Sequence, residues 1–242
     1  TCAAELRRRR KRGIVEMPNK RVYINKAVCE GCGDCSVQSN CLSVMPVATP
    51  YGTKRAIDQS GCNRDFTCVE GFCPAFVTLE GATPRRKAGR DVYDTTNLPK
   101  PELPTLDQPY GVMIAGVGGT GVVTVGQLIG MAAHLEGKGV SILDFTGMAQ
   151  KGGSVLTHLR ITASAGDEIS ARVPLAGAGL VIAGDMVAGA GADTLAAMRP
   201  DVTHSVINSD ILPVAESVNN PDFLLDDEEL ARRIRHASGK DH

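Results

Sequence analysis

Apolar runs and glycine-rich turns alternate through the second half of the chain. Residues 111–115 (GVMIA) form an apolar, β-prone run that predicts a buried strand. An apolar stretch at residues 122–135 predicts a helix, and residues 140–144 predict the next strand. Further strands are expected at 155–161, 180–183 and 205–208, with a helix at 193–198. This alternation predicts an α/β domain with a mostly parallel, Rossmann-like sheet that helices cover on both faces.

The first hundred residues carry a sparser pattern. Residues 21–24 (RVYI) predict a short strand, and residues 76–79 (FVTL) predict a strand that returns beside it. Six consecutive basic side chains precede them at residues 7–12. This run is typical either of nucleic-acid contact, or of a surface segment that is simply solvated or that docks an acidic partner such as a ferredoxin. We favour the second interpretation, because no aromatic residues are interleaved with the basic ones.

A polar segment at residues 82–109 separates the two patterns. It shows neither helical nor strand periodicity, and it holds five of the thirteen prolines. Such a segment is extended and fairly stiff, so we expect a linker between domains. At the far end, residues 226–240 are charged and predict a helix with no closing strand after it, which indicates a domain that is cut short.

Seven of the eight cysteines lie between positions 29 and 73. Cys29, Cys32 and Cys35 form a C-x2-C-x2-C triplet, and Cys73 comes directly before Pro74. In bacterial ferredoxins a triplet of this spacing and a remote Cys-Pro together bind one 4Fe–4S cluster. The small residues between the first three cysteines permit the tight curl that such a loop needs. The pattern therefore predicts one 4Fe–4S cluster on these four cysteines, and electron transfer as its role.

Three further thiols, Cys41, Cys62 and Cys68, fall outside that set. Their role has three open interpretations: a second cluster with a non-standard fourth ligand, a three-iron cluster, or buried thiols that bind nothing. Cys2 is an extra candidate ligand. Zinc is an alternative, but its sites usually combine two C-x2-C pairs or one pair with histidines, and this stretch contains no histidine. A disulfide framework is another, although the chain opens with charged residues and no apolar signal segment.

The turn after residues 111–115 reads G-V-G-G-T-G, with its glycines at Gly116, Gly118, Gly119 and Gly121. This spacing between a strand and a helix is found in dinucleotide sites, where the helix N-terminus offers N–H groups to a phosphate. Asp144 stands where a ribose-binding acid would be, and Gln150 and Lys151 lie in a later loop that would contact a ligand or another subunit. The alternative is that the glycines only make a tight turn and that Asp144 pairs locally, because the motif alone is weakly specific.

Composition adds few constraints. The 242 residues suffice for one large domain or two modest ones, and a formal net charge of −1 selects no class of partner. No apolar run reaches the roughly 18–20 residues of a membrane span. Many cysteines without an export signal are typical of a reducing compartment, so we expect a cytoplasmic protein with neither membrane nor nucleic acid as a partner.

Several stretches together resemble the indolepyruvate ferredoxin oxidoreductase family, which belongs to the thiamine-diphosphate-dependent 2-oxoacid:ferredoxin oxidoreductases. They are TCAAE before the arginine run, CEGCGDCSVQSNC, GCNRDFTCVEGFCP, GVGGTGVVT and GMAQKGGS. The order of parts is similar to the long single-chain bacterial form. The resemblance implies a basic lead-in at residues 1–22, a ferredoxin-like α+β iron–sulfur module at 23–81, the linker at 82–109 and a gamma-type α/β domain at 110–242.

The resemblance also implies a reaction, the oxidative decarboxylation of indolepyruvate or another arylpyruvate to an acyl-CoA. The whole enzyme would use thiamine diphosphate, Mg and coenzyme A, and would pass electrons through iron–sulfur clusters to ferredoxin. The implied partners are ferredoxin and thiamine-diphosphate-binding domains or subunits in an oligomer.

One departure from the family bears on activity. The thiamine-diphosphate motif of the family begins with G-D-G. In this sequence Gly184-Asp185 is followed by Met186, so the motif is missing. We therefore expect this chain alone to be inactive, and its catalytic residues stay unassigned. The alternative function is a flavin- or NAD-binding electron-transfer protein fused to a ferredoxin module, in which the glycine turn would bind the nucleotide.

Overall fold

The computed structural model describes residues 3–82, 98–147, 152–167, 169–214, 216–220 and 222–239. The chain forms two compact units. We call Thr1–Leu103 with Ala215–Phe223 the cysteine unit, and Pro104–Val214 with Leu224–His242 the sheet unit. Each unit is described by itself.

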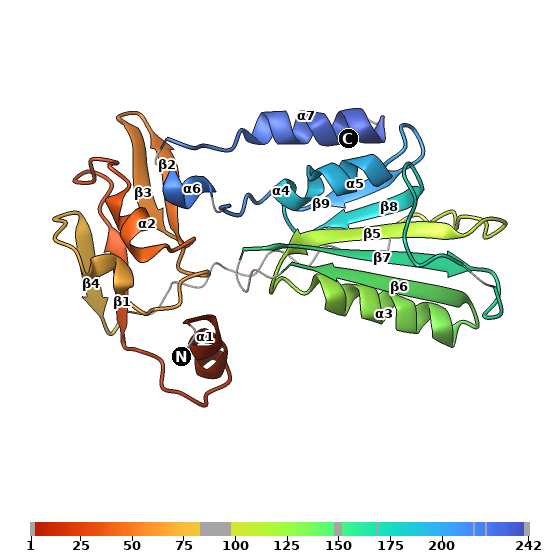
Figure 1. Ribbon diagram of the computed structural model, residues 1–242, viewed down its shortest axis with the longest axis horizontal. Coiled ribbons are helices and arrows are strands. Elements are labelled where there is room, and N and C mark those ends of the chain that lie inside the picture. The colour runs from red at the N-terminus through yellow and green to blue at the C-terminus, as the bar shows by residue number, and fades with distance from the viewer. Residues whose placement is uncertain are drawn as a thin grey trace. The chain divides into compact units, whose positions relative to one another are not determined.

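The sheet unit is built on five strands in the order β6-β7-β5-β8-β9 (Figure 1). Their bounds are β5 (Tyr110–Val117), β6 (Gly139–Thr146), β7 (Ser154–Thr162), β8 (Ala178–Ala183) and β9 (His204–Ile207). β5 pairs in parallel with β8, and β8 with β9, whereas β7 runs antiparallel to both β5 and β6. The predicted strands are all present, but the sheet is mixed, and the expectation of a mostly parallel Rossmann-like sheet was wrong in this respect.

The short connection between β6 and β7 explains the reversed strand. Only residues 147–153 separate the two strands. Neighbouring parallel strands need a crossover of about a dozen residues or more, so a connection of this length permits only antiparallel pairing. β7 then lies between β5 and β6, so the strands predicted at 111–115 and 140–144 are not neighbours in the sheet.

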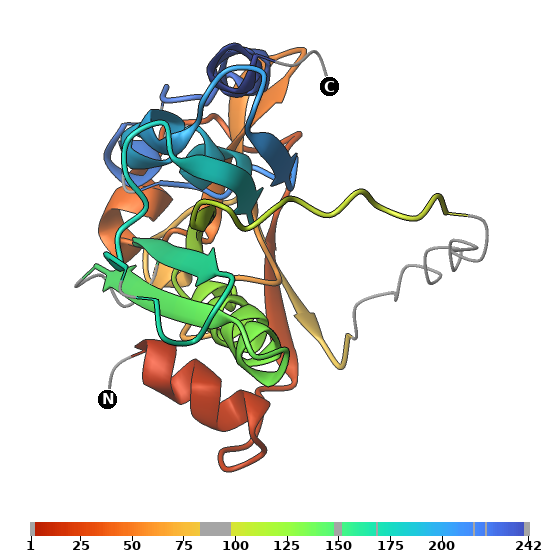
Figure 2. The ribbon, with the colours of Figure 1, turned by 90° about the vertical axis from the view of Figure 1, so that its right-hand side faces the viewer.

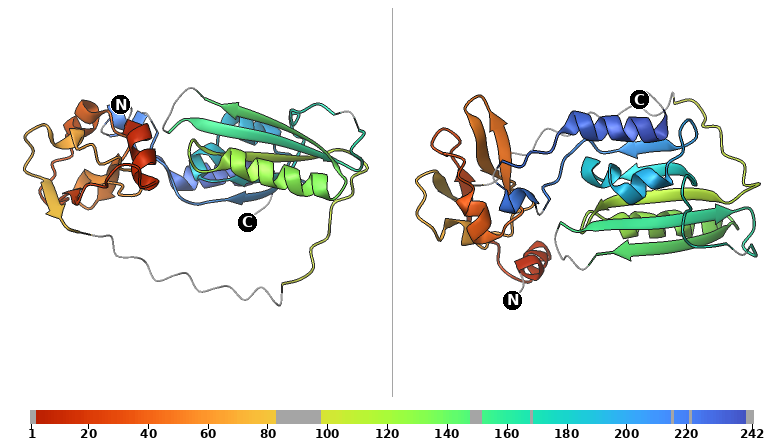
Figure 3. Two further views of the ribbon diagram at one scale, coloured as in Figure 1. Left: turned by 90° about the horizontal axis from the view of Figure 1, so that it is seen from below. Right: turned by 45° about the horizontal axis from the view of Figure 1, so that its top comes forward.

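Helices cover both faces of this sheet, as the sequence predicted. α3 (Val122–Leu135) packs on one face, and its bounds coincide with the predicted helix. Figure 3 (left) shows α3 lying across the strands. Gly126 allows this close approach, because a Cβ atom there would come 2.5 Å from Thr157 Cγ2. Residues Val112 and Ile114 of β5 point into this layer with Leu159 of β7.

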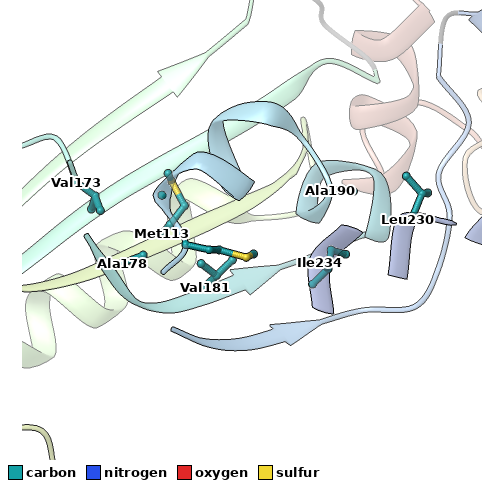
Figure 4. Packing of buried hydrophobic residues seen from close by; sticks show 9 residues of the cluster. Met113, Val173, Ala178, Val181, Ala190, Leu230 and Ile234 are labelled. Carbon is teal, nitrogen blue, oxygen red and sulfur yellow. The ribbon is translucent and has the colours of Figure 1, made fainter. Parts of the chain in front are cut away.

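The opposite face of the sheet carries α4 (Met186–Gly189), α5 (Ala192–Ala197) and α7 (Asp227–Ser238). Met113 and Val181 meet Ile234 of α7 in the larger apolar core of this unit (Figure 4). The alternation of side chains along β5 thus supplies both cores, since successive residues of a strand point to opposite faces.

The cysteine unit contains two small antiparallel sheets. β1 (Lys20–Ile24) pairs with β4 (Phe76–Glu80), which confirms the predicted returning strand. A hairpin of β2 (Val44–Thr49) and β3 (Gly52–Ile57) forms the second sheet, which the sequence pattern did not predict.

Four short helices lie in the described part of the cysteine unit. α1 (Ala3–Lys11) contains most of the basic run, and α2 (Asp34–Ser39) and the 3-10 helix η1 (Thr67–Val69) each follow a cysteine-containing loop. α6 (Glu216–Asn219) comes from late in the chain, yet it packs against α2 and β2.

Two further predictions concern the less regular segments. Residues 82 and 98–109, the described part of the predicted linker, contain neither helix nor strand (Figure 2). Among the helices that the structure describes, none is long and apolar enough to cross a membrane.

Candidate metal centre

The first cysteine loop curls because two of its residues adopt left-handed backbone conformations. Gly31 and Gly33 both have φ of +84°, and they flank Cys32. Gly33 also caps α2, whose first turn carries Cys35. The tight curl expected of the triplet is therefore present, and glycine adopts this conformation at little cost.

The remote cysteine is brought to this loop by the β1–β4 pair. The N–H of Asn25, which follows β1, donates to the carbonyl of Ala75 at 2.7 Å, and the N–H of Cys29 donates to the carbonyl of Asn25 at 2.9 Å. The N–H of Phe76 donates to the carbonyl of Cys73 at 3.3 Å. The same end of the sheet thus carries the start of the triplet and the Cys-Pro segment.

A cavity of about 310 Å³ lies between these segments, and we call it the large cysteine cavity. The four cysteines of the predicted cluster all line it, together with Cys68; they are Cys29, Cys32, Cys35 and Cys73. Cys32 and Cys73 are exposed, whereas the other two are half-buried. The structure therefore brings together the four residues that the sequence grouped.

Arg55 of β3 also lines the large cysteine cavity, although only 1% of it is exposed. Its Nη1 donates to the carbonyl of Ser217 in α6 at 3.3 Å, while its Nε and Nη2 have no hydrogen-bond partner. A buried guanidinium with two nitrogen donors left without a partner is costly unless an anion faces it. An iron–sulfur cluster bound by four thiolates carries net negative charge, so the residues around the cavity fit such a group.

The thiols respond to the same surroundings. Burial raises the pKa of the Cys35 thiol, and the positive charge of Arg55 opposes that rise. Metal ligation requires the thiolate, so Arg55 favours the form of Cys35 that binds metal.

The remaining three described cysteines, Cys41, Cys62 and Cys68, line a separate space of about 20 Å³, the small cysteine cavity. Burial raises the pKa of Cys68 to about 12, and the negative charges of Cys41 and Cys62 add to the rise. The seven cysteines that the structure describes form no disulfide. Within the described ranges, no three His, Cys, Asp or Glu side chains are placed to share a single metal ion.

The basic run is less solvated than the sequence suggested. Arg10 of α1 donates from Nη1 to the carbonyls of Asn63 at 2.8 Å and Arg64 at 3.1 Å, and Arg7 donates to the carbonyl of Ser60. Arg10 therefore holds the loop between Cys62 and Cys68, and Arg7 holds the turn just before it. Arg8 and Arg9 pair with Glu5 on the same helix.

The glycine turn of the sheet unit and the predicted ribose acid Asp144 both make hydrogen bonds within the unit. Gly119 and Gly121 have φ of +91° and +95°, as a tight turn requires, but the N–H of Gly118 is already bonded to the carbonyl of Gly153 at 2.7 Å. Asp144 lies on β6, separated from this turn by β7, and accepts a hydrogen bond from Thr157 Oγ1 at 2.6 Å.

The other residues assigned to this turn are Gly116, Gln150 and Lys151. A Cβ atom on Gly116 would come 2.7 Å from Val122 Cγ2, so this glycine is needed for close packing of α3 on β5. Gln150 and Lys151 lie outside the described residues. The arrangement favours local pairing of Asp144 over ribose binding.

A substitution at Gly31 tests the curl of the cysteine loop. A Cβ atom there would overlap the carbonyl oxygen of Thr53 in β3, and φ is positive. We expect Gly31→Ala to lose most of the iron of the cluster predicted on Cys29, Cys32, Cys35 and Cys73 after anaerobic reconstitution, because the rigid strand backbone forces the loop away. Gly52→Ala is the matched control, since Gly52 has φ of +89° with open space around it. Equal iron in the two variants would contradict this account.

Sequence reasoning missed Arg55 and the contribution of α6. A basic residue in a short strand gives no sign of burial, and nothing near Ser217 in the sequence points to a metal site. Both are identified by the hydrogen bond between Arg55 and Ser217, which joins residues 162 positions apart in the chain.

The family model that matches this chain covers mainly the sheet unit. Residues 111–237 match the family model described as "Pyruvate ferredoxin/flavodoxin oxidoreductase". The indolepyruvate oxidoreductase subunit IorB of Archaeoglobus fulgidus is 40% identical over 72 residues, which are 30% of this chain and 34% of that protein. IorB of Pyrococcus horikoshii is 39% identical over 66 residues, 27% of this chain and 31% of that protein. The chain thus spans about a third of the length of these curated relatives.

Two solved structures show a weak similarity to this chain. The pyruvate oxidoreductase subunit PORC of Thermotoga maritima is 18% identical with a TM-score of 0.34, covering 54% of this chain and 57% of that one. The gamma subunit of the keto/oxoacid ferredoxin oxidoreductase of Geobacter sulfurreducens is 19% identical with a TM-score of 0.32, covering 43% and 53%. The family match extends over more than half of the sequence. The chain belongs to the pyruvate ferredoxin/flavodoxin oxidoreductase family.

Proposed function

We propose that this chain is the electron-transfer and gamma-type portion of a 2-oxoacid:ferredoxin oxidoreductase that acts on indolepyruvate or another arylpyruvate. The observation that carries the proposal is the convergence of Cys29, Cys32, Cys35 and Cys73 on one cavity. The family match of the adjoining sheet unit supports it, as do the names of the relatives, which are indolepyruvate oxidoreductase subunits.

The four thiolates would hold a 4Fe–4S cluster, which supplies one-electron transfer when it is bound. The chain's own contribution is to present three thiolates on the curled first loop and the fourth on the Cys73-Pro74 segment, and to place the Arg55 guanidinium against their negative charge. Cys32 and Cys73 are exposed, so they lie on the side from which an electron partner such as ferredoxin would approach.

The rest of the reaction is assigned to partner domains or subunits. Thiamine diphosphate, Mg and coenzyme A would be bound in the whole enzyme, and the sheet unit would join it as the gamma-type domain of an oligomer. We therefore expect no turnover by this chain alone. The domain division at residues 1–22, 23–81, 82–109 and 110–242 forms part of this proposal.

Ferredoxin reduction by the assembled enzyme tests the proposal. We expect ferredoxin to be reduced when indolepyruvate and coenzyme A are supplied, faster than with pyruvate, and not to be reduced with NADH. Reduction that depends on NADH and not on any 2-oxoacid would overturn the proposal in favour of a nucleotide-binding electron-transfer protein.

The charge of Arg55 gives a separate prediction. Adding an electron to a cluster increases its negative charge, and a nearby cation stabilises the reduced form. Arg55→Met should therefore lower the reduction potential by about 60 mV or more, a tenfold change in a one-electron equilibrium. Potentiometric titration followed by EPR measures the shift.

Lys54→Met is the control for that experiment. Lys54 precedes Arg55 on β3 and loses the same charge, but it is not among the residues that line the large cysteine cavity. An equal shift in both variants would contradict a specific role for Arg55.

A further inference from the structure

The second cysteine loop repeats the spacing of the first with one change of residue. Cys62, Asp65 and Cys68 are separated by two residues each, which is the spacing of the C-x2-C-x2-C triplet. A carboxylate stands at the middle position, where the first loop has Cys32. The sequence therefore contains C-x2-D-x2-C as well as C-x2-C-x2-C.

The backbone repeats as well. Cys32 lies between two left-handed residues, both with φ of +84°. Asp65 likewise lies between two left-handed residues, Arg64 with φ of +56° and Phe66 with φ of +66°. Residues other than glycine seldom adopt this conformation, so its occurrence at both equivalent positions indicates a loop held in a defined shape.

The loops also end alike. Gly33 caps α2, and the second residue of that helix is Cys35; Phe66 caps η1, and the second residue of that helix is Cys68. Asp65 thus occupies the position of Cys32 in a second copy of the same loop. Arg10 of α1 holds this second copy through the carbonyls of Asn63 and Arg64.

The structure brings a fourth residue to this loop. Cys41 follows the first triplet, yet it lines the small cysteine cavity with Cys62, Asp65 and Cys68. Cys73 follows the second loop and lines the large cavity with the first triplet. Each loop therefore receives its fourth ligand candidate from the segment after the other loop, the exchange that two-cluster ferredoxins show.

We propose that Asp65 is the fourth ligand of a second iron–sulfur cluster, completing a set with Cys41, Cys62 and Cys68. This inference rests on the proposed function, which assigns the first cluster. In the structure, Asp65 Oδ1 accepts two hydrogen bonds from Thr67, one from its N–H at 3.3 Å and one from its Oγ1 hydroxyl at 3.0 Å. We assign the other carboxylate oxygen, Oδ2, to the iron.

The carboxylate gives the site its chemistry. Oxygen is a harder ligand than sulfur and suits iron in a cluster less well than a thiolate does. The iron on Asp65 is therefore the one released most readily. Asp65 is exposed, so this iron is accessible to solvent.

Iron content and EPR of four full-length proteins test the assignment. We expect about eight irons in the wild type after anaerobic reconstitution, and the loss of at least one in Asp65→Asn, which keeps an oxygen for the Thr67 hydrogen bonds. One equivalent of ferricyanide, by accepting one electron, should release one Fe²⁺ from the wild type and generate a three-iron EPR signal. Asp65→Cys should keep all its iron under the same treatment.

Glu70→Gln is the matched control, because Glu70 is an exposed acid two residues beyond Cys68 that lines neither cysteine cavity. Its iron content and its EPR spectrum, before and after ferricyanide, should equal those of the wild type. About four irons in every protein, or identical iron and EPR in Asp65→Asn and the wild type, would overturn the Asp65 assignment and leave the first cluster in place. No iron in any protein would overturn the proposed function as well.

Discussion

Replacing both Cys32 and Cys73 with alanine is expected to remove about four irons from each chain, the whole content of one cluster. The two residues supply half of the proposed ligands, and they come from the triplet and from the remote Cys-Pro segment. Two remaining thiolates do not hold a cube of four irons. Iron analysis and the visible absorbance of the reconstituted protein measure the loss.

The double variant separates ligation from folding. Both side chains are exposed, so their truncation leaves no buried cavity and the chain without iron should unfold at the wild-type denaturant concentration. Glu30→Ala is the control, because Glu30 lies in the same loop and lines the same cavity without contributing a thiolate. Wild-type iron content in the double variant would show that these cysteines are not ligands.

Leu159→Ala is expected to destabilise the sheet unit by about 2–5 kcal/mol. Leu159 is fully buried on β7, where it packs with Val112, Ile114 and Val122 between the sheet and α3. Its truncation leaves a cavity that α3 cannot fill by moving closer, because Gly126 and Gly130 already bring the helix against the strands. Urea denaturation followed by circular dichroism measures the change.

Leu128→Ala is the matched control for that measurement. Leu128 lies on α3 with 66% of its surface exposed, and alanine is a good helix former, so its truncation should change the free energy of unfolding by less than about 0.5 kcal/mol. Similar losses in the two variants would contradict the packing of α3 on β7.

The pattern of apolar positions located the main elements of the sheet unit. The predicted helix at 122–135 coincides with α3, and the runs at 111–115 and 155–161 lie within β5 and β7. The direction of β7 was not predicted, because an apolar run has no direction and only the length of the connection before it determines the pairing. The hairpin of β2 and β3 was missed because Pro46 and the charged Lys54 and Arg55 interrupt its apolar pattern.

Part of the candidate site could be predicted from the local spacing of residues. The triplet and Cys73-Pro74 grouped four cysteines that the structure places around one cavity. Asp65 could also be predicted from its spacing, but a pattern that contains only cysteines does not include it. Arg55 could not be predicted, because its burial depends on a strand pairing and on α6. Ser217 of α6 lies 162 residues further along the chain.

Iron and acid-labile sulfide per chain, measured on anaerobically purified protein with an EPR spectrum after reduction, test the central claim most directly. The account predicts about four of each for the cluster on Cys29, Cys32, Cys35 and Cys73, and about eight with the second site filled, with EPR signals of reduced clusters. Stoichiometric zinc without iron would contradict the claim that this chain transfers electrons.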